Sequence, residues 1–135
     1  QPVKSWSKEK WTELVDRLYR QGVAHVVVAC GTSKGAFRVE RAASVIDASV
    51  HDLTSQLRVA RLMIGPSSGP LALASHCGVP CVWWANDDQP AAQLYAQDGP
   101  VGANWNPHHL KHHRAAVSWD PSVDEVWTAV QAALH

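Results

Sequence analysis

The sequence predicts an α/β protein with a Rossmann-like, three-layer fold built on a parallel sheet. Short apolar segments alternate with amphipathic segments, a pattern typical of βαβ units with right-handed crossovers. Residues 26–29 (Val-Val-Val-Ala) are apolar on both faces, as expected for a strand in a parallel sheet that helices cover on both sides. Gly and Pro residues separate the segments, as turns between short elements require.

The first predicted helix lies between Ser7, the expected N-cap, and Gly22, the expected stop. Its apolar side chains recur at the three- and four-residue spacing of one helix face: Trp11, Leu14, Val15 and Leu18. A strand over residues 23–30 follows, then a loop over 31–35 and a short helix over 36–43.

The same alternation continues to the end of the chain. Further strands are expected over residues 44–49, 61–65, 80–85 and 115–119. The helix between the first two of these is expected to have Asp52 as its cap and these inward side chains: Leu53, Leu57 and Ala60.

Two more helices are expected over residues 71–77, where Gly78 ends the helix, and over 89–97, while residues 98–114 look irregular. Ser122 and Glu125 have the spacing of a capping box. The final helix that they begin has one apolar face: Val123, Val126, Trp127, Val130 and Leu134.

The composition argues against several function classes. A chain of 135 residues is expected to form one domain over residues 1–135. Twelve basic and twelve acidic residues cancel, which argues against a nucleic acid or an anionic membrane as partner. No apolar run approaches the roughly 20 residues of a transmembrane helix. Three scattered cysteines suit a reducing compartment, and a start at Gln1 predicts that the chain is part of a longer protein.

The most informative segment, residues 62–82, is interpreted as strand, tight loop, helix, Gly stop and strand. Its loop over residues 67–70 (Ser-Ser-Gly-Pro) offers two hydroxyls, a glycine that admits a ligand, and a proline suited to a first helical turn. The N–H groups of Ser68, Gly69 and Leu71 are then expected to point outward, where the helix dipole favours an anion such as a diphosphate. An ordinary strand-to-helix turn with a serine N-cap is the alternative interpretation.

Parts of this segment resemble the donor-site signature of glycosyltransferase family 9, the heptosyltransferase-like enzymes: Ser68-Gly69-Pro70, Leu73-Ala74 and Gly78-Val79-Pro80. The start of the chain is also similar. Residues 4–7 (Lys-Ser-Trp-Ser) resemble the family's Lys-x-Trp-Pro, and a Trp-x-x-Leu helix ending at Gly22 follows them. The resemblance covers nearly the whole chain, with a fairly specific central motif and weak ends.

The resemblance implies that the chain is the nucleotide-sugar-binding, C-terminal half of an inverting GT-B glycosyltransferase. The loop over residues 67–71 would surround the diphosphate, Lys4 would neutralise it, Glu40 would bind the ribose, and the base would lie against residues 31–33. A solvated terminal lysine and a surface glutamate are the alternative interpretations of Lys4 and Glu40. The expected substrate-binding residues are therefore Lys4, Gly31, Thr32, Glu40, Ser67, Ser68, Gly69, Pro70 and Leu71.

Two departures from the family pattern bear on activity. Ser67 stands where the family has Asp, and Ala72 stands where it has a helical His, so less polar chemistry faces the diphosphate. The family places its general base in an N-terminal acceptor domain, which this chain is expected to lack. We therefore expect no catalytic residue, metal or cofactor in the chain, and an isolated domain that binds a nucleotide-diphosphate sugar without turnover.

Two other functions stay open on the same fold. One is a non-catalytic nucleotide-sugar-binding or assembly module, which Ser67 and Ala72 favour. The other is a sugar-nucleotide epimerase, because a fold by itself does not choose between activities. For a transferase, the resemblance implies hexosyl or heptosyl transfer in lipopolysaccharide biosynthesis, in the cytoplasm or peripherally at the inner membrane.

Four other groups of residues were weighed as sites. Residues 108–113 (His-His-Leu-Lys-His-His) could bind a metal, but a solvated polar turn is the preferred interpretation. Three residues could suggest a zinc site, but a buried structural role is the preferred interpretation: His76, Cys77 and Cys81. Residues 105–107 (Trp-Asn-Pro) are expected to pack, with ordering of a loop over the donor site as the alternative. Residues 87–88 (Asp-Asp) read as turn formers, with a sugar or Mg²⁺ contact as the alternative.

Overall fold

The computed structural model of the chain describes residues 6–23, 25–30, 39, 42–46, 49–67, 69–86 and 106–135. These residues belong to two compact units, one over Trp6–Leu53 and one that begins at Thr54 and runs to His135. Each unit contains its own parallel sheet. The expectation of a single domain over residues 1–135 stays a prediction.

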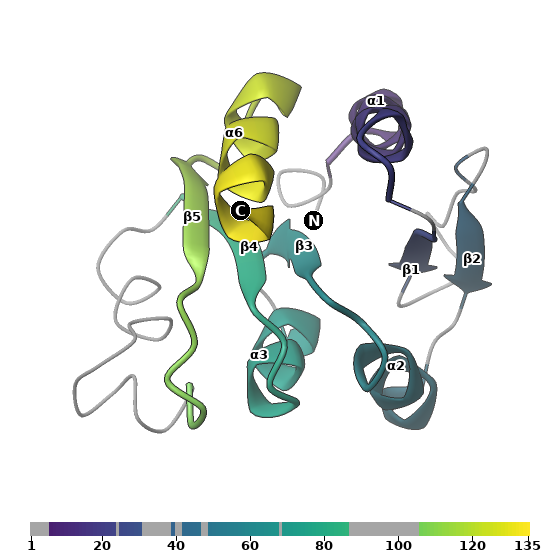
Figure 1. Cartoon of the computed structure of the whole chain (residues 1–135), viewed down its shortest axis with the longest axis vertical. Helices are drawn as coiled ribbons and strands as arrows, with labels where there is room; N and C mark the ends of the chain where they lie inside the picture. The colour runs from purple at the N-terminus through teal and green to yellow at the C-terminus, as the bar shows by residue number, and fades with distance from the viewer. Residues whose placement is uncertain are drawn as a thin grey trace. The chain divides into compact units, whose positions relative to one another are not determined.

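The first unit contains helix α1 (Lys8–Arg20) and strands β1 (Val27–Cys30) and β2 (Ala43–Ile46), drawn in purple and blue in Figure 1. The predicted capping of α1 is confirmed, because the Ser7 side chain accepts a hydrogen bond from the Lys10 amide at 3.2 Å. The predicted apolar face is buried at its centre: Leu14, Val15 and Leu18. The rings of Trp6 and Trp11 meet edge to face with centroids 4.8 Å apart, which covers the start of the helix.

Strands β1 and β2 run parallel, with Val27 paired to Ala43 at one end and Cys30 to Ile46 at the other. The predicted strand over 23–30 is therefore shorter at its start, and the expected helix over 36–43 cannot include Ala43, which begins β2. The rest of that expected helix, apart from Val39 and Ala42, lies outside the described residues.

Helix α2 (Val50–Leu57) crosses the junction between the two units. Its start differs from the prediction, because Ser49 caps the helix and Asp52 sits one turn inside it. The Ser49 hydroxyl accepts from the Asp52 amide at 3.0 Å, and the Asp52 carboxylate accepts from the Ser49 amide at 3.2 Å. The hydrogen bond from the Ser49 backbone has the larger effect on Asp52 and the one with the Ser49 side chain the smaller, and both lower the pKa of this carboxylate.

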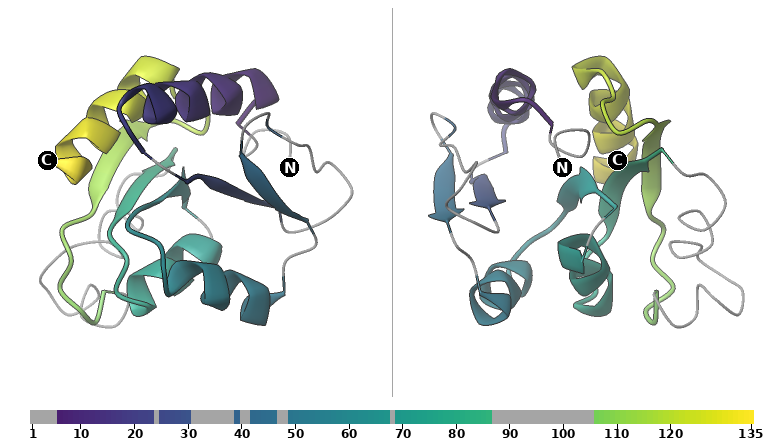
Figure 2. Two further views of the ribbon diagram at one scale, coloured as in Figure 1. Left: turned by 45° about the vertical axis from the view of Figure 1, so that its right-hand side comes forward. Right: turned by 180° about the vertical axis from the view of Figure 1, so that it is seen from behind.

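The second unit is built on strands β3 (Met63–Pro66), β4 (Cys81–Ala85) and β5 (His113–Val117), in the order β3-β4-β5 and all parallel. Helix α3 (Gly69–His76) packs on β3 and β4, and helix α6 (Val123–Leu134) packs on β4 and β5. The two helices lie on opposite faces of the sheet (Figures 1 and 2). The predicted Rossmann-like α/β fold with a parallel sheet is confirmed.

The core of the second unit surrounds its central strand. All five residues of β4 are buried, and Trp84 is 0% exposed. The helices contribute fully buried apolar side chains from both faces: Leu71 and Ala74 from α3, and Val126 and Val130 from α6. A strand covered in this way must be apolar on both faces, which explains the Cys-Val-Trp-Trp-Ala sequence of β4.

Two boundaries in the second unit differ from the sequence prediction. Helix α3 begins at Gly69, two residues before the expected start, and β5 begins at His113 within the stretch expected to be irregular. The sequence did not predict the start of β5 because its first residues are polar, and a strand is recognised in a sequence by alternating apolar positions. The predicted capping box of α6 is confirmed by reciprocal hydrogen bonds between Ser122 and Glu125. The helix expected over 89–97 lies outside the described residues.

Candidate functional site

The candidate site is the corner where β3 ends and α3 begins. The Ser67 amide donates to the Trp84 main-chain oxygen at 2.8 Å, which fastens the residue after β3 to the end of β4. Helix α3 begins two residues later at Gly69. Its N-terminus therefore lies at the carboxyl edge of the parallel sheet, the edge at which α/β proteins of this kind bind ligands.

The described residues of this corner differ in exposure. The Ser67 side chain is half-buried and Pro70 is exposed in the first turn of α3, the position at which proline costs the helix no hydrogen bond. Leu71 is 0% exposed, and its side chain anchors the helix in the core. Ser68 lies outside the described residues, and the binding role of residues 67–71 stays a prediction.

Gly65 leaves room beside the corner. A Cβ atom added at this buried position of β3 would meet no heavy atom within 4 Å among the residues that the structure describes. The next strand residue, Pro66, leads directly into the Ser67 loop. At Gly65, β3 thus carries no side chain, and no described residue fills the place that a side chain would take.

The other predicted binding residues, Lys4, Gly31, Thr32 and Glu40, lie outside the described residues, as do Asp87 and Asp88. Their roles toward phosphate, base and ribose stay predictions. Two described neighbours are core residues, since Trp6 is 3% exposed and Val39 is 2% exposed.

Sequence reasoning missed Arg114, which points along β5 toward the carboxyl end of β4. Its Nη2 donates to the Ala85 main-chain oxygen at 2.8 Å, and its guanidinium carbon lies 4.7 Å from the centroid of the Trp83 ring. No signal in the sequence could have found this contact, because it joins residues 29 positions apart.

Sequence reasoning also missed a buried polar network at the opposite, amino edge of the sheet. His112 accepts at Nδ1 from the Cys81 amide at 2.9 Å, and its Nε2 lies 3.1 Å from the Ser75 hydroxyl. The Ser75 hydroxyl in turn donates to Asn106 Oδ1 at 3.4 Å. The Asn106 side chain also binds both main-chain polar groups of Leu110, accepting from the amide at 3.0 Å and donating to the oxygen at 2.8 Å. Ser75 and Asn106 are both 0% exposed.

The Ser75–His112 pair cannot work as a nucleophile and its base. A neutral imidazole whose Nδ1 accepts a hydrogen bond must carry its proton on Nε2, so His112 donates to the serine and has no lone pair there to receive a proton. Burial, with a smaller effect of His113, lowers the pKa of His112 to about 4 and keeps the ring neutral. The network is therefore structural, and it corrects the interpretation of His112 as part of a solvated turn.

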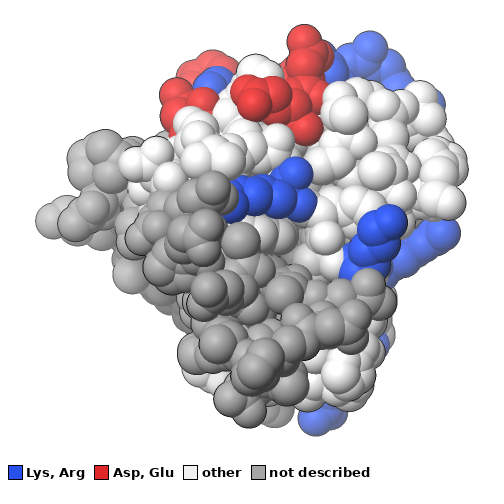
Figure 3. Space-filling view, turned by 90° about the vertical axis from the view of Figure 1, so that its left-hand side faces the viewer, with Lys and Arg blue, Asp and Glu red and all other residues white. Residues whose placement is uncertain are grey.

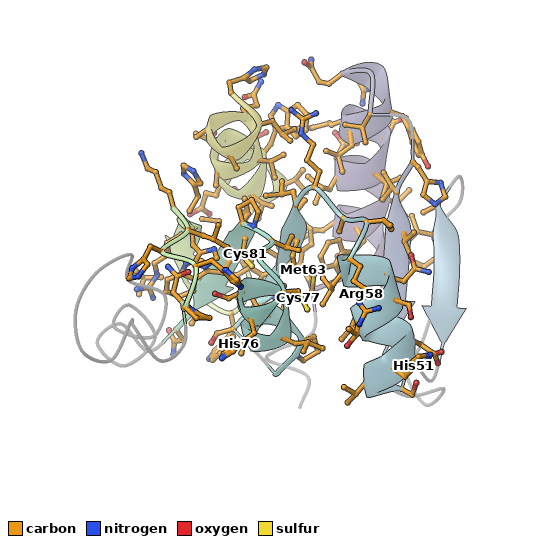
Figure 4. All side chains as sticks on the ribbon, turned by 60° about the horizontal axis from the view of Figure 1, so that its bottom comes forward. His51, Arg58, Met63, His76, Cys77 and Cys81 are labelled. Carbon is orange, nitrogen blue, oxygen red and sulfur yellow. The ribbon has the colours of Figure 1, made fainter. Side chains whose placement is uncertain are left out.

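The neighbouring histidines and cysteines do not form a metal centre in the part of the chain that the structure describes. His108 and His109 are exposed, as a solvated turn requires, whereas His113 begins β5. Figure 4 shows His76 and Cys77 at the end of α3 and Cys81 on the neighbouring strand. Burial raises the pKa of the Cys81 thiol to about 12, so this thiol stays protonated near neutral pH.

The described part of the surface carries charged side chains of both signs (Figure 3). Acidic and basic side chains both occur on the face drawn in Figure 3, and no continuous basic surface forms there among the described residues. Exposed acidic residues lie at and before the start of α6: Asp120, Asp124 and Glu125. None of the described helices has the length and apolar character needed to cross a membrane.

Comparison with known proteins bears on the corner directly. The family model of glycosyltransferase family 9 (heptosyltransferase) matches residues 1–83. The match includes α1, the β3–α3 corner and the start of β4, together with all nine predicted binding residues. Comparison with curated proteins and with solved structures gives no significant match. Because the matched region covers more than half of its 135 residues, the chain belongs to glycosyltransferase family 9.

Proposed function

We propose that the chain is the donor-binding domain of an inverting glycosyltransferase of the GT-B type, and that its ligand is a nucleotide-diphosphate sugar. Family membership supports a transferase, and the β3–α3 corner supports the donor role. The observation that carries the proposal is the start of α3 at the carboxyl edge of the sheet, held there by the 2.8 Å bond from Ser67 to Trp84. Helix amides at such an edge suit a diphosphate.

The proposed contribution to the reaction is electrostatic. As the glycosidic bond to the diphosphate breaks, negative charge grows on the leaving phosphate oxygens. Main-chain N–H groups around Ser68 and Gly69, together with Lys4, would stabilise that charge without a metal ion. Glu40 would hold the ribose, and residues 31–33 would contact the base. The general base would come from an N-terminal acceptor domain, so the chain alone would bind without turnover.

The substitution Gly69→Val tests this assignment. A branched side chain at the first residue of α3 would block approach of the diphosphate to the backbone. We expect nucleotide affinity to fall by about 10- to 100-fold, equivalent to losing one hydrogen bond to a charged group at roughly 1.5–3 kcal/mol. The assay is an NMR titration with ADP, UDP and GDP, followed by their sugars, and shifts should concentrate at residues 67–71.

The control is Ala132→Val, which places the same branched side chain on the exposed face of α6, across the sheet from the corner. This variant should bind as the parent does, and both variants should unfold near the parental temperature. Unchanged nucleotide affinity in Gly69→Val, with a parent that binds, would remove the corner from the proposal.

A second candidate function is a non-catalytic nucleotide-sugar-binding or assembly module. Ser67 and Ala72 favour it, because each replaces a polar family residue at the diphosphate. Transferase activity in a longer protein that carries an acceptor domain would exclude this function. A sugar-nucleotide epimerase would instead be identified by isomerised products from a panel of nucleotide sugars. For the transferase, we place the reaction in lipopolysaccharide biosynthesis, in the cytoplasm or peripherally at the inner membrane.

A further inference from the structure

Arg114 makes two contacts with the central strand β4 and one with its own strand β5. Its Nη2 donates to the Ala85 main-chain oxygen at 2.8 Å, and its Nε donates to the Ala116 main-chain oxygen at 3.2 Å. The guanidinium carbon lies 4.7 Å from the centroid of the Trp83 ring, and that indole is only 3% exposed. The side chain therefore holds the ends of β4 and β5 together over a fixed aromatic surface.

A β-bulge accompanies this contact. Arg114 pairs with Trp83, but Ala116 pairs with Trp84, so Ala115 is an extra residue in β5. A bulge interrupts the ladder of main-chain hydrogen bonds and redirects a side chain, and bulges are frequent beside functional sites. Here the two carbonyl oxygens that Arg114 binds lie beyond the interruption, toward the carboxyl ends of the strands.

The strand end that Arg114 binds also carries the Ser67 corner. The Trp84 oxygen accepts from the Ser67 amide, and the oxygen of the next residue, Ala85, accepts from Arg114. The end of β4 is thus fixed on both sides, toward β3 by Ser67 and toward β5 by Arg114. A change at Arg114 can reach the start of α3 through two consecutive residues of one strand.

We propose that Arg114 is a positioning residue for the diphosphate corner, an inference that rests on the proposed function. The guanidinium holds the end of β4 in position, and the end of β4 in turn holds the Ser67 backbone. Ser67 then positions the first turn of α3 against the phosphates. Arginine suits this task because its planar fork binds two carbonyl oxygens and stacks on an indole at once. A lysine keeps the charge and the length but lacks the fork.

The test compares Arg114→Lys and Arg114→Gln with Lys111→Gln, which removes a charge from an exposed residue three positions earlier. The first readout is amide hydrogen exchange at Ser67, measured without ligand and relative to amides in α6. The second is the ratio of affinities for a nucleoside diphosphate and its monophosphate, with ADP, UDP and GDP and their monophosphates as probes. A purely global loss of stability would speed exchange in α6 as well and would leave that ratio unchanged.

We expect both Arg114 variants to raise the relative exchange rate at Ser67 and to lower the diphosphate preference by about tenfold, the equivalent of roughly one hydrogen bond. Lys111→Gln should change neither. The inference would be overturned if the Ser67 amide of Arg114→Lys exchanged at the parental rate. It would also be overturned if the parent binds diphosphates and the variant keeps the parental ratio of diphosphate to monophosphate affinity. A parent that binds no diphosphate, with faster Ser67 exchange in the variants, would refute the proposed function and support the link from Arg114 to Ser67. Arg114→Lys provides both readouts even if Arg114→Gln does not fold.

Discussion

The half-buried imidazole of His112 should make the stability of the chain depend on pH between about 6.5 and 4. Burial holds the native pKa of His112 near 4, whereas the ordinary value is 6.5. Between these pH values His112 is protonated in the unfolded chain but neutral in the native chain. The free energy of unfolding must therefore fall as the pH falls. The contribution of His112 is complete above pH 6.5 and is lost progressively down to pH 4.

The size of the effect follows from the difference between 6.5 and about 4. At roughly 1.4 kcal/mol for each pKa unit, this difference corresponds to at most about 3.4 kcal/mol. The ring is only partly buried, and solvent screening reduces that ceiling, so we expect a loss of about 1–2 kcal/mol between pH 7.5 and pH 4.5. His113 adds to the loss in the same direction, because burial and then the charge of Lys111 lower its pKa.

The assay is urea unfolding followed by tryptophan fluorescence, for which the seven Trp residues provide the signal. His112→Asn keeps a side-chain acceptor for the Cys81 amide and removes the titrating ring. Between pH 7.5 and pH 4.5 the unfolding free energy of this variant should fall by about 1–2 kcal/mol less than that of the parent. The variant should also be less stable at every pH, because it lacks the hydrogen bond to Ser75. His109→Asn is the matched control, since this exposed histidine has a φ of 53°, which asparagine accepts. Equal pH slopes in the parent and in His112→Asn would refute the reasoning.

Two further predictions concern helix ends. Gly78→Ala should cost about 1–2 kcal/mol, because Gly78 has a φ of 82° while an added Cβ would meet, among the described residues, only the His108 ring at an ordinary 3.8 Å. Gly78→Asn should cost less, and parental thermal stability in the alanine variant would show that the conformation is not strained. Ser122→Ala should cost about 1 kcal/mol in thermal unfolding, because the Glu125 amide loses its 3.1 Å partner. Ser118→Ala, which removes a turn contact to Asp120, should cost less, and equal losses would argue against a special role of the cap.

Features that depend on neighbours in sequence could be predicted without the structure. The cap and stop of α1, the capping box of α6 and the buried strand β4 each follow from residues within one element. The same holds for the β3–α3 corner, because strand, tight loop and proline-containing first turn are consecutive in the chain. Local hydrogen bonds and hydrophobic periodicity carry these predictions.

Features that depend on distant partners could not be predicted. His112 looks like one polar residue in a histidine-rich turn until the fold places it against Ser75, 37 positions earlier. Arg114 looks like a surface residue before a short strand until the pairing of β5 with β4 places it beside Ala85. A single sequence contains no record of register or bulges, because these are decided by which strands pair.

Polar side chains have different partners at the two edges of the sheet in the second unit. At the amino edge, His112, Ser75 and Asn106 satisfy one another, so the polar atoms there are committed to structure. At the carboxyl edge, Arg114 and Ser67 bind main-chain oxygens of β4, which fixes the frame from which α3 starts. A ligand held by main-chain donors needs such a frame, because those donors cannot adjust as side chains can. Substitutions at the amino edge should therefore change stability far more than nucleotide affinity, whereas substitutions of Arg114 should change nucleotide affinity.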